Sequence, residues 1–319
     1  MRDYRLLFSQ SNKEAPPLTF LAGDMSLRRY YRFWEGEQPY VLMDAPAPEN
    51  PQRFCELADF LVSIGFSAPR VLQRDLDQGY LVLEDLGDQT FTRCLGNGQD
   101  PEPLYQLAID VLIALHKRVK EPPLDLNDYT PETLVAEVAV FFDWYWPEQY
   151  GHKLAADKKD EILSLWADVF AQALTSPLGL VLRDFHVDNL IWLPERQSLQ
   201  RCGLLDFQDA LWGPRVYDVV SLLEDARRDL SPTLVTALWQ RYCAAFPEEN
   251  ADKLWATATI LSAGRHLKII GVFMRYYVRH GNPQYLVHIP RVWRLFYQCI
   301  EHPALLPIKQ WFHENLPTH

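Results

Sequence analysis

The chain has 319 residues, 48% of them hydrophobic and 23% charged, which is typical of a globular protein. A formal net charge of -11 excludes a long-range basic field for nucleic acid, although a single cleft could still be positive. The five cysteines are widely spaced and include no C-x-x-C pair, so neither a disulfide framework nor a zinc site is expected. No signal-peptide pattern and no run of about 18 apolar residues is found, so we expect a cytoplasmic protein without membrane spans.

The first 85 residues are predicted to be rich in strands, with one helix. Turns are expected at Gly23-Asp24 and at residues 35–37, because a glycine adjoins a charged residue in each. Apolar residues recur at helical spacing in residues 51–65, which predicts a helix. Strands are predicted at residues 18–23, 30–34, 39–46 and 79–88.

The rest of the chain is predicted to be mostly helical. Helices are expected at residues 103–118, 131–146, 156–174, 216–229, 231–245, 251–278 and 284–300. Three short β runs are set into this region, at residues 178–182, 189–193 and 202–207. The second and third flank a polar segment, which predicts a hairpin.

Three polar residues at the ends of these β runs form the pattern most indicative of chemistry. Asp184 is followed five residues later by Asn189, and Asp206 ends the predicted hairpin. Phosphoryl transfer from ATP needs a carboxylate near the attacking hydroxyl and hard oxygen ligands for Mg²⁺. The spacing matches the kinase motifs H-R-D-x-x-x-x-N and D-F-G, which here are L-R-D-F-H-V-D-N and D-F-Q.

The segments LRDFHVDNLIWLPER (182–196) and GLLDFQDALWGPRVYDVVSLLEDARRD (203–229), with GDMSLRRYYRF (23–33) and YVLMDAP (40–46), resemble the aminoglycoside phosphotransferase family. The similarity is closest to the bacterial anomeric kinases of N-acetylmuramate and N-acetylglucosamine in cell-wall sugar recycling. The resemblance implies an α+β, protein-kinase-like fold with two lobes. A small β-rich nucleotide-binding lobe would span residues 1–85, and a larger helical lobe for catalysis and substrate binding would span residues 86–319.

The resemblance also implies roles for individual residues, with ATP and Mg²⁺ as cofactors and a small sugar as the substrate. Asp184 would be the catalytic base, and Asn189 and Asp206 would hold Mg²⁺. The remaining implied positions are Ser26 in the turn over the phosphates, Glu84 to Leu86 as the hinge whose backbone binds adenine, Asp209 as an accessory acid, and His186 as a brace or sugar contact.

The sequence departs from the kinase pattern in three places. Leu182 replaces the histidine of H-R-D, Met43 stands where the strand lysine is expected, and the phosphate-covering loop has only Gly23. Either another cation meets the phosphates or that contact is missing. Arginine is suited to the contact because it can bind phosphate through two parallel hydrogen bonds. The candidates are Arg28, Arg29 and Arg32.

Several alternatives remain open from the sequence. The acceptor could be an aminoglycoside, choline or another hydroxyl compound, and a non-catalytic nucleotide-binding protein of the same fold is a further hypothesis. Asp218 is expected to anchor the catalytic loop. Arg265, His266 and Lys268 could receive an anionic substrate group or could lie on a solvated face. The sequence does not indicate an oligomeric state.

Overall fold

The computed structural model describes residue 4, residues 15–23 and residues 26–316, so Asp24 of the first predicted turn lies outside the described residues. The chain forms two compact units. Unit 1 contains residues 1–111 and 187–209, and unit 2 contains residues 112–186 and 210–319. In this division the segment 187–209 groups with the N-terminal part of the chain.

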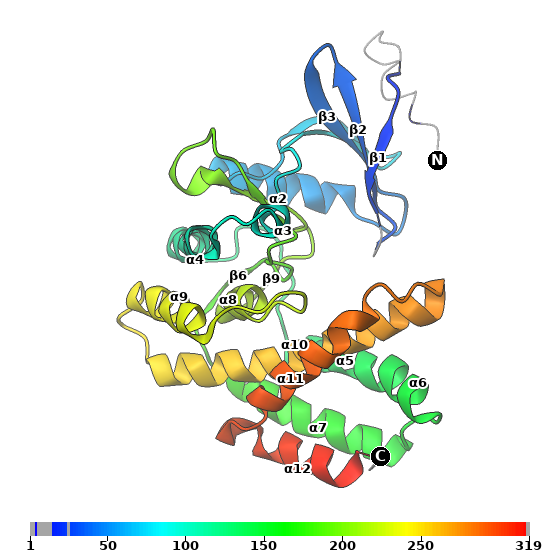
Figure 1. Cartoon of the computed structure of the whole chain (residues 1–319), viewed down its shortest axis with the longest axis vertical. Coiled ribbons are helices and arrows are strands. Elements are labelled where there is room, and N and C mark those ends of the chain that lie inside the picture. Colours follow the sequence, from blue (N-terminus) through cyan, green and yellow to red (C-terminus); the bar gives the residue numbers. More distant parts are fainter. Residues whose placement is uncertain (1–3, 5–14, 24–25, 317–319) are drawn as a thin grey trace. The chain divides into compact units, whose positions relative to one another are not determined.

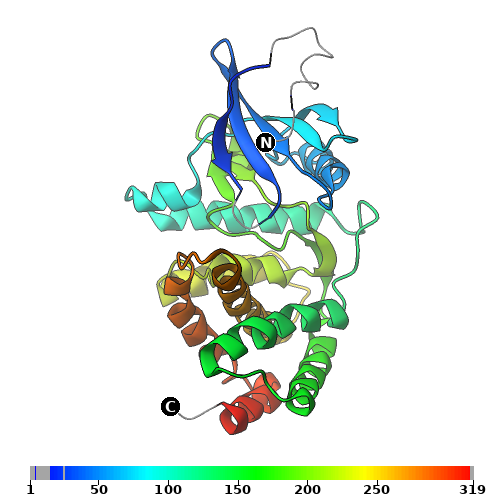
Figure 2. The same cartoon turned by 90° about the vertical axis from the view of Figure 1, so that its right-hand side faces the viewer.

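Unit 1 contains an antiparallel five-stranded sheet in the order β1-β2-β3-β5-β4 (Figures 1 and 2). The strands are β1 (Thr19–Ala22), β2 (Arg29–Glu35), β3 (Gln38–Asp44), β4 (Val71–Asp75) and β5 (Tyr80–Glu84). The four predicted strands are confirmed. The sequence prediction missed β4, which is an edge strand of five residues that carries three polar side chains.

The hairpin between β2 and β3 has a two-residue loop. Glu35 pairs with Gln38, and Gly36 between them has a φ of 62°. A positive φ is easily adopted by glycine and matches the tight turns that follow the twist of an antiparallel pair. The turn predicted at residues 35–37 is thereby confirmed.

The helices among the described residues of unit 1 are α2 (Pro51–Ser63), α3 (Phe91–Gly96) and α4 (Pro101–Arg118), the last of which continues into unit 2. The side chain of Asn50 caps α2 by accepting a hydrogen bond from the backbone N–H of Arg53 at 3.0 Å. The predicted hairpin is confirmed as β7 (Leu190–Trp192) and β8 (Cys202–Leu204), joined through the 3-10 turn η2 (Ser198–Arg201).

The β7–β8 hairpin belongs to unit 1 through both hydrogen bonds and packing. The backbone N–H of Leu204 donates to the carbonyl oxygen of Ser67 at 2.8 Å. Leu86, in the segment after β5, packs with Ile191 and Leu193 in a small apolar cluster. These contacts join residues more than a hundred positions apart in the sequence. Local sequence patterns do not reveal such contacts, so they placed the hairpin with the helical region.

Unit 2 is mainly helical. Its elements are α5 (Pro131–Val140), the π-helix η1 (Phe141–Tyr145), α6 (Trp146–Tyr150), α7 (Ala156–Ala173), β6 (Leu178–Val181), β9 (Leu211–Pro214), α8 (Val216–Leu223), α9 (Pro232–Ala244), α10 (Ala251–His280), η3 (Leu286–His288), α11 (Ile289–Cys299), η4 (Pro303–Leu305) and α12 (Leu306–Asn315). Strands β6 and β9 form an antiparallel pair. None of the helices in the described residues combines the length and the apolar character that a bilayer crossing requires.

The helix α10 is the central element of unit 2 and packs against α5, η1, α7, α8 and α11 (Figure 1). Two glycines permit this close packing. A Cβ atom on Gly264 would lie 2.6 Å from the ring of Phe170, and one on Gly271 would lie 2.6 Å from the backbone nitrogen of Phe141. The backbone of α10 therefore approaches its neighbours more closely than any larger residue would allow.

Three of the predicted helices need correction. The helix predicted at 216–229 ends at Leu223, because the chain turns there and Asp225 accepts a hydrogen bond from the backbone N–H of Arg227 at 2.8 Å. The helix predicted at 131–146 is α5 followed by a π-helix that faces Gly271. The segment predicted at 284–300 is the 3-10 turn η3 followed by α11.

Candidate active site

The loop that carries Asp184 lies in unit 2 and is held by a buried carboxylate. Asp218, on α8, is fully buried and accepts hydrogen bonds from the backbone N–H groups of Leu182 at 2.6 Å and Arg183 at 2.9 Å. Arg183 has a φ of 69°, which is uncommon for a residue other than glycine. The expected anchoring of the loop by Asp218 is therefore observed, and it holds the residue before Asp184 in a strained conformation.

The environment of Asp184 favours its ionised form. Burial alone raises the pKa of this carboxyl, but the positive charges of Lys268, Arg183 and Arg265, together with His186, lower it below its ordinary value. A carboxylate that stays ionised at neutral pH can accept a proton from a hydroxyl. The pKa of Asp218 is shifted the other way, because burial outweighs its backbone hydrogen bonds and raises its pKa to about 7.

Glu137 connects the loop to α10. Its carboxylate forms an ion pair with Arg183, accepts a hydrogen bond from the Nζ of Lys268 at 2.8 Å and accepts another from the hydroxyl of Tyr129 at 2.6 Å. Burial raises the pKa of Glu137, but the charges of Lys268 and Arg183 lower it by more. The net pKa is below the ordinary value, so Glu137 is a carboxylate. One carboxylate thus binds two cations that lie beside Asp184, whose own carboxylate is a second negative charge there.

His186 is buried, with 8% of its surface exposed. Burial lowers the pKa of its imidazole below the ordinary value, while Asp225 and Asp184 raise it and Arg227 and Arg265 lower it. The ring is therefore neutral at pH 7. This suits a brace or a hydrogen-bonding contact better than a source of positive charge.

Asn189 and Asp206 meet in unit 1. The Nδ2 of Asn189 lies 3.5 Å from the Oδ2 of Asp206. Asp206 has a φ of 58°, the second unusual backbone conformation among the motif residues. Strained backbone of this kind occurs often at functional sites, where the surrounding structure holds it in place.

Gln208 ties Asp206 to Asp209. Its Nε2 donates to the Oδ1 of Asp206 and to the Oδ2 of Asp209, each at 2.9 Å. The Oε1 of Gln208 is buried, and no hydrogen-bond partner reaches it within the described residues. Two carboxylates and two amide oxygens provide the hard oxygen ligands that Mg²⁺ prefers, so this group fits the ion that the motif implies.

Arg28 is the arginine that the structure brings to this group. Its Nη2 lies 3.4 Å from the Oδ1 of Asp206 and 3.6 Å from the Oδ2 of Asp209, and its Nη1 lies 3.1 Å from the Oε2 of Glu49. Burial alone lowers the pKa of Arg28, but Tyr30 and the three carboxylates raise it above its ordinary value. The hydroxyl of Ser26 accepts a hydrogen bond from the backbone N–H of Arg28 at 3.2 Å, which shapes the approach to β2.

The other two candidate arginines are placed differently. Arg29 is exposed at the start of β2. Arg32 is bound by two carboxylates, with its Nε 2.5 Å from the Oδ2 of Asp85 and its Nη1 2.7 Å from the Oδ2 of Asp88. The buried Met43 offers no cation in β3. Of the three arginines, Arg28 is therefore the one whose position best suits replacement of the missing lysine.

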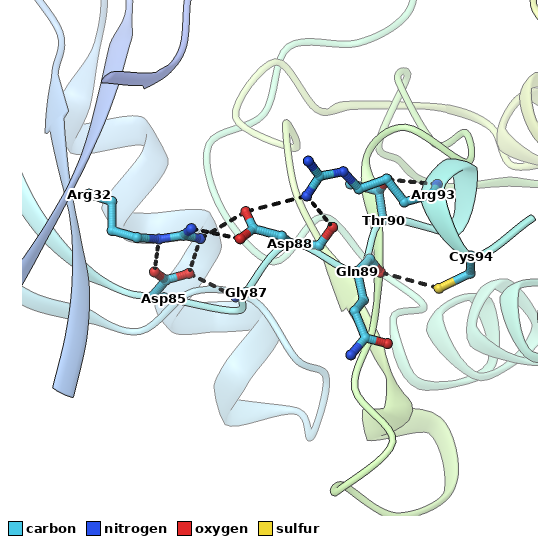
Figure 3. A network of polar contacts seen from close by, with 8 residues as sticks. All are labelled: Arg32, Asp85, Gly87, Asp88, Gln89, Thr90, Arg93 and Cys94. Carbon is cyan, nitrogen blue, oxygen red and sulfur yellow. Dashed lines mark hydrogen bonds and ion pairs between the residues drawn. The ribbon is translucent and has the colours of Figure 1, made fainter. Parts of the chain in front are cut away.

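Figure 3 shows how Arg32 holds the segment that follows β5. The backbone N–H of Gly87 donates to the Oδ1 of Asp85 at 2.7 Å, and the Nη1 of Arg93 donates to the carbonyl oxygen of Asp88 at 3.1 Å. The predicted hinge lies at the start of this segment. The side chain of Glu84 accepts a hydrogen bond from Arg196 at 2.6 Å, which ties the end of β5 to the β7–β8 hairpin.

Three residues of these groups escaped sequence reasoning. Glu137 lies in an ordinary helical pattern, and nothing in the sequence links it to Arg183. Glu49 follows a proline-rich segment and gives no signal for its contact with Arg28. Gln208 could have been found, because it stands between Asp206 and Asp209 at the position of the glycine in D-F-G.

The fold and the two groups of residues define a kinase-like phosphotransferase. Residues 17–254 match the model of the phosphotransferase enzyme family named APH, and the chain belongs to this family. Among solved structures, the ADP-bound aminoglycoside phosphotransferase APH(2'')-Ib superposes with a TM-score of 0.59 at 16% identity, over 93% of this chain and 97% of that one. The fructosamine-3-kinase homologue of Haemophilus somnus also gives a TM-score of 0.59, at 13% identity. The predicted α+β, protein-kinase-like fold is confirmed.

Two relatives have a more specific name. The N-acetylmuramate/N-acetylglucosamine kinase of Caulobacter vibrioides is 35% identical, over 93% of this chain and 92% of its own length. The protein of the same name from Pseudomonas aeruginosa is 36% identical, over 88% of this chain and 83% of its own length. The family resemblance predicted from the sequence is confirmed.

Proposed function

We propose that this phosphotransferase transfers the γ-phosphoryl group of ATP to the anomeric hydroxyl of N-acetylmuramate and N-acetylglucosamine, forming the sugar 1-phosphates. One observation carries the choice of substrate: relatives that are 35% and 36% identical over most of the chain are named for these two sugars. The groups around Asp184 and Asp206 support the reaction class.

In the proposed reaction, the carboxylate of Asp184 orients the acceptor hydroxyl and takes its proton as the oxygen attacks the γ-phosphorus. The lowered pKa of Asp184 keeps it ionised for this task. Asp218 keeps the loop in place through the backbone of Leu182 and Arg183. General-base assistance of this kind contributes about 10²–10⁴-fold to the rate.

Asn189 and Asp206 would hold Mg²⁺, with Gln208 orienting the carboxylate of Asp206. When bound, the ion would offset the negative charge of the phosphates. Arg28 would take the place of the strand lysine against the phosphates, while Ser26 shapes the preceding turn. The backbone of the segment from Glu84 to Leu86 would bind adenine. Arg29 would meet phosphate only from an exposed position, and Arg32 would leave Asp85 and Asp88 to do so, so both are weaker candidates than Arg28.

The proposal is tested by measuring ADP release with Mg-ATP and a panel of acceptors. The panel is N-acetylmuramate, N-acetylglucosamine, glucose, kanamycin and choline, with phosphorus NMR of each product. We expect ADP release and an anomeric phosphate signal with the two N-acetyl sugars alone.

Turnover with kanamycin or choline only would retain the phosphotransferase and reject the sugar assignment. A phosphate signal at a position other than the anomeric carbon would reject the proposed acceptor hydroxyl. ADP release that is independent of any acceptor would show ATP hydrolysis, which also contradicts the proposal.

A further inference from the structure

Arg265 is a buried cation, and one nitrogen of its guanidinium lacks an acceptor among the described residues. It lies in the middle of α10, and only 7% of its surface is exposed. Its Nη1 atom is buried, and no hydrogen-bond acceptor of the described residues reaches it. The sequence left open whether Arg265 lies on a solvated face, and its burial excludes that alternative.

A buried guanidinium nitrogen without an acceptor is unfavourable for folding. Charged side chains are rarely buried unless they are paired, because the loss of hydration is not offset. The neighbouring cation on the same helix face shows the usual solution, since Lys268 donates to Glu137 at 2.8 Å. Arg265 lacks such a bond at Nη1, so its retention there points to a partner that arrives with a ligand.

The position of Arg265 relates it to the catalytic loop. Residues three apart on a helix lie on the same face, so Arg265 and Lys268 are neighbours. Lys268 and Arg183 bind the same carboxylate, that of Glu137, and Arg183 precedes Asp184 in the chain. The pKa of Asp184 is consistent with this placement, because Arg265 is among the positive charges that lower it.

We propose that Arg265 binds an anionic group of the acceptor sugar, namely the lactyl carboxylate that N-acetylmuramate carries and N-acetylglucosamine lacks. This inference rests on the proposed function and adds to it a residue that distinguishes the two sugars. Guanidinium binds carboxylate through charge-assisted hydrogen bonds, and a buried nitrogen that lacks an acceptor is suited to that contact. A carboxylate is favoured over a neutral hydroxyl because a hydrogen bond between two charged groups is about twice as strong as one between neutral groups.

The test compares Arg265→Met, Arg265→Lys and the unaltered protein on both sugars. We expect Arg265→Met to lower kcat/KM for N-acetylmuramate by about 10–100-fold, the range of a lost hydrogen bond to a charged group. For N-acetylglucosamine, kcat/KM should fall at least tenfold less, because this sugar loses only the effect of Arg265 on the pKa of Asp184, which both sugars share, and no contact of its own. Arg265→Lys should recover part of the loss, because it retains the charge but not the planar geometry.

Arg279→Met is the matched control, because Arg279 is on the same helix but exposed. Arg279→Met should leave kcat/KM unchanged for both sugars. Thermal denaturation of both variants should show that each is folded at the assay temperature.

Equal losses with both sugars, with or without a raised KM for ATP, would overturn the inference and assign Arg265 to phosphate binding or to the structure of the loop. Unchanged kinetics would also overturn it. Failure of the unaltered protein to phosphorylate either sugar would instead overturn the proposed function, and this inference with it.

Discussion

The carboxyl groups of Asp184 and Asp218 are both buried, yet their surroundings shift their pKa values in opposite directions. Asp184 has cations around it, so the ionised form is favoured. Asp218 accepts hydrogen bonds from two backbone N–H groups, which lower its pKa, but burial and the negative charge of Asp184 raise it. The net result is a pKa of about 7. The difference between the proposed base and the residue that anchors its loop therefore follows from which charges lie near each carboxyl.

Replacement of the base tests the role assigned to Asp184. Asp184→Asn has nearly the same shape but cannot accept the proton, so kcat should fall by about 10²–10⁴-fold. The measurement is steady-state ADP release with the acceptor sugar, accompanied by circular dichroism to confirm folding. The exposed Asp229→Asn in the same unit serves as a control. Turnover of Asp184→Asn within tenfold of the unaltered protein would remove Asp184 from the role of base.

His116 gives a prediction on acid stability. It is fully buried against the hydroxyl of Tyr242 at 2.9 Å, and burial lowers its pKa to about 3. Between about pH 3 and 6.5 the unfolded chain therefore binds one more proton than the native chain, so the free energy of unfolding falls as the pH falls through this window. From pH 7 to pH 5 this residue should account for about 2 kcal/mol of the loss.

The measurement is urea denaturation of His116→Asn and of the unaltered protein at pH 7 and pH 5. The variant should lose less stability between the two pH values. His186, whose pKa is also lowered, keeps part of the acid sensitivity in both proteins, so the difference between them isolates His116. The exposed His280→Asn is the control, and an equal loss in all three proteins would contradict the assignment.

At the scale of elements, α10 organises unit 2. It brings Ser262, Arg265 and Lys268 to one side, where Ser262 donates to the Oε2 of Glu224 at 2.6 Å and Lys268 reaches Glu137. On other sides it packs through Gly264 and Gly271 against α7 and η1. The helix thus combines close packing with the placement of the charged groups near Asp184.

Glycine at position 271 is expected to be required by packing. An alanine usually stabilises a helix by about 1 kcal/mol relative to glycine. At position 271 its Cβ would lie 2.6 Å from backbone atoms of Phe141 and Val140, which cannot move aside as a flexible side chain could. Gly271→Ala should therefore lower the free energy of unfolding by about 1–3 kcal/mol, as overpacking does.

Gly96 at the end of α3 is the matched control, because a Cβ there would meet nothing within 4 Å. Gly96→Ala should leave the free energy of unfolding unchanged or raise it by up to about 1 kcal/mol. Both variants are compared by denaturant titration. A stabilised Gly271→Ala protein would show that α10 and η1 can separate at little cost.

The elements themselves were largely predictable, because helices and strands depend on local periodicity. The turn between β2 and β3 was found from a glycine between charged residues, and the β7–β8 hairpin from two short β runs that flank a polar segment. What escaped prediction depends on contacts made elsewhere: β4 is a strand because it pairs with β5, and the π-helix η1 lies opposite Gly271. The helix at 216–229 was predicted six residues too long, since Asp225 turns the chain through a hydrogen bond that periodicity does not reveal.

At the scale of the whole molecule, the cysteines form no disulfide bond and are mostly buried. All five are free, and four of them are buried: Cys55, Cys94, Cys202 and Cys299. Burial raises the pKa of these thiols, to about 11 for Cys55. It also raises the pKa of the half-buried Cys243 thiol. A thiol with a raised pKa contains little of the reactive thiolate at neutral pH.

We therefore expect a thiol reagent such as Ellman's reagent to label at most Cys243 in the native protein at pH 7.5, and slowly. All five thiols should react once guanidinium chloride unfolds the chain. The Cys243→Ser variant should show almost no native labelling. Rapid native labelling of more than one thiol would indicate that the protein opens around its buried cysteines.

Sequence alone determined the reaction class of this protein, because Asp184, Asn189 and Asp206 form a pattern whose spacing is set by a short loop and a hairpin. It also determined the family, through long segments of matching residues. The tertiary structure alone decided what surrounds these residues. Asp218 lies 36 positions from Leu182, and Lys268 lies 131 positions from Glu137, yet each pair forms a hydrogen bond. Charge, burial and pKa depend on such distant neighbours, and only folding brings them together.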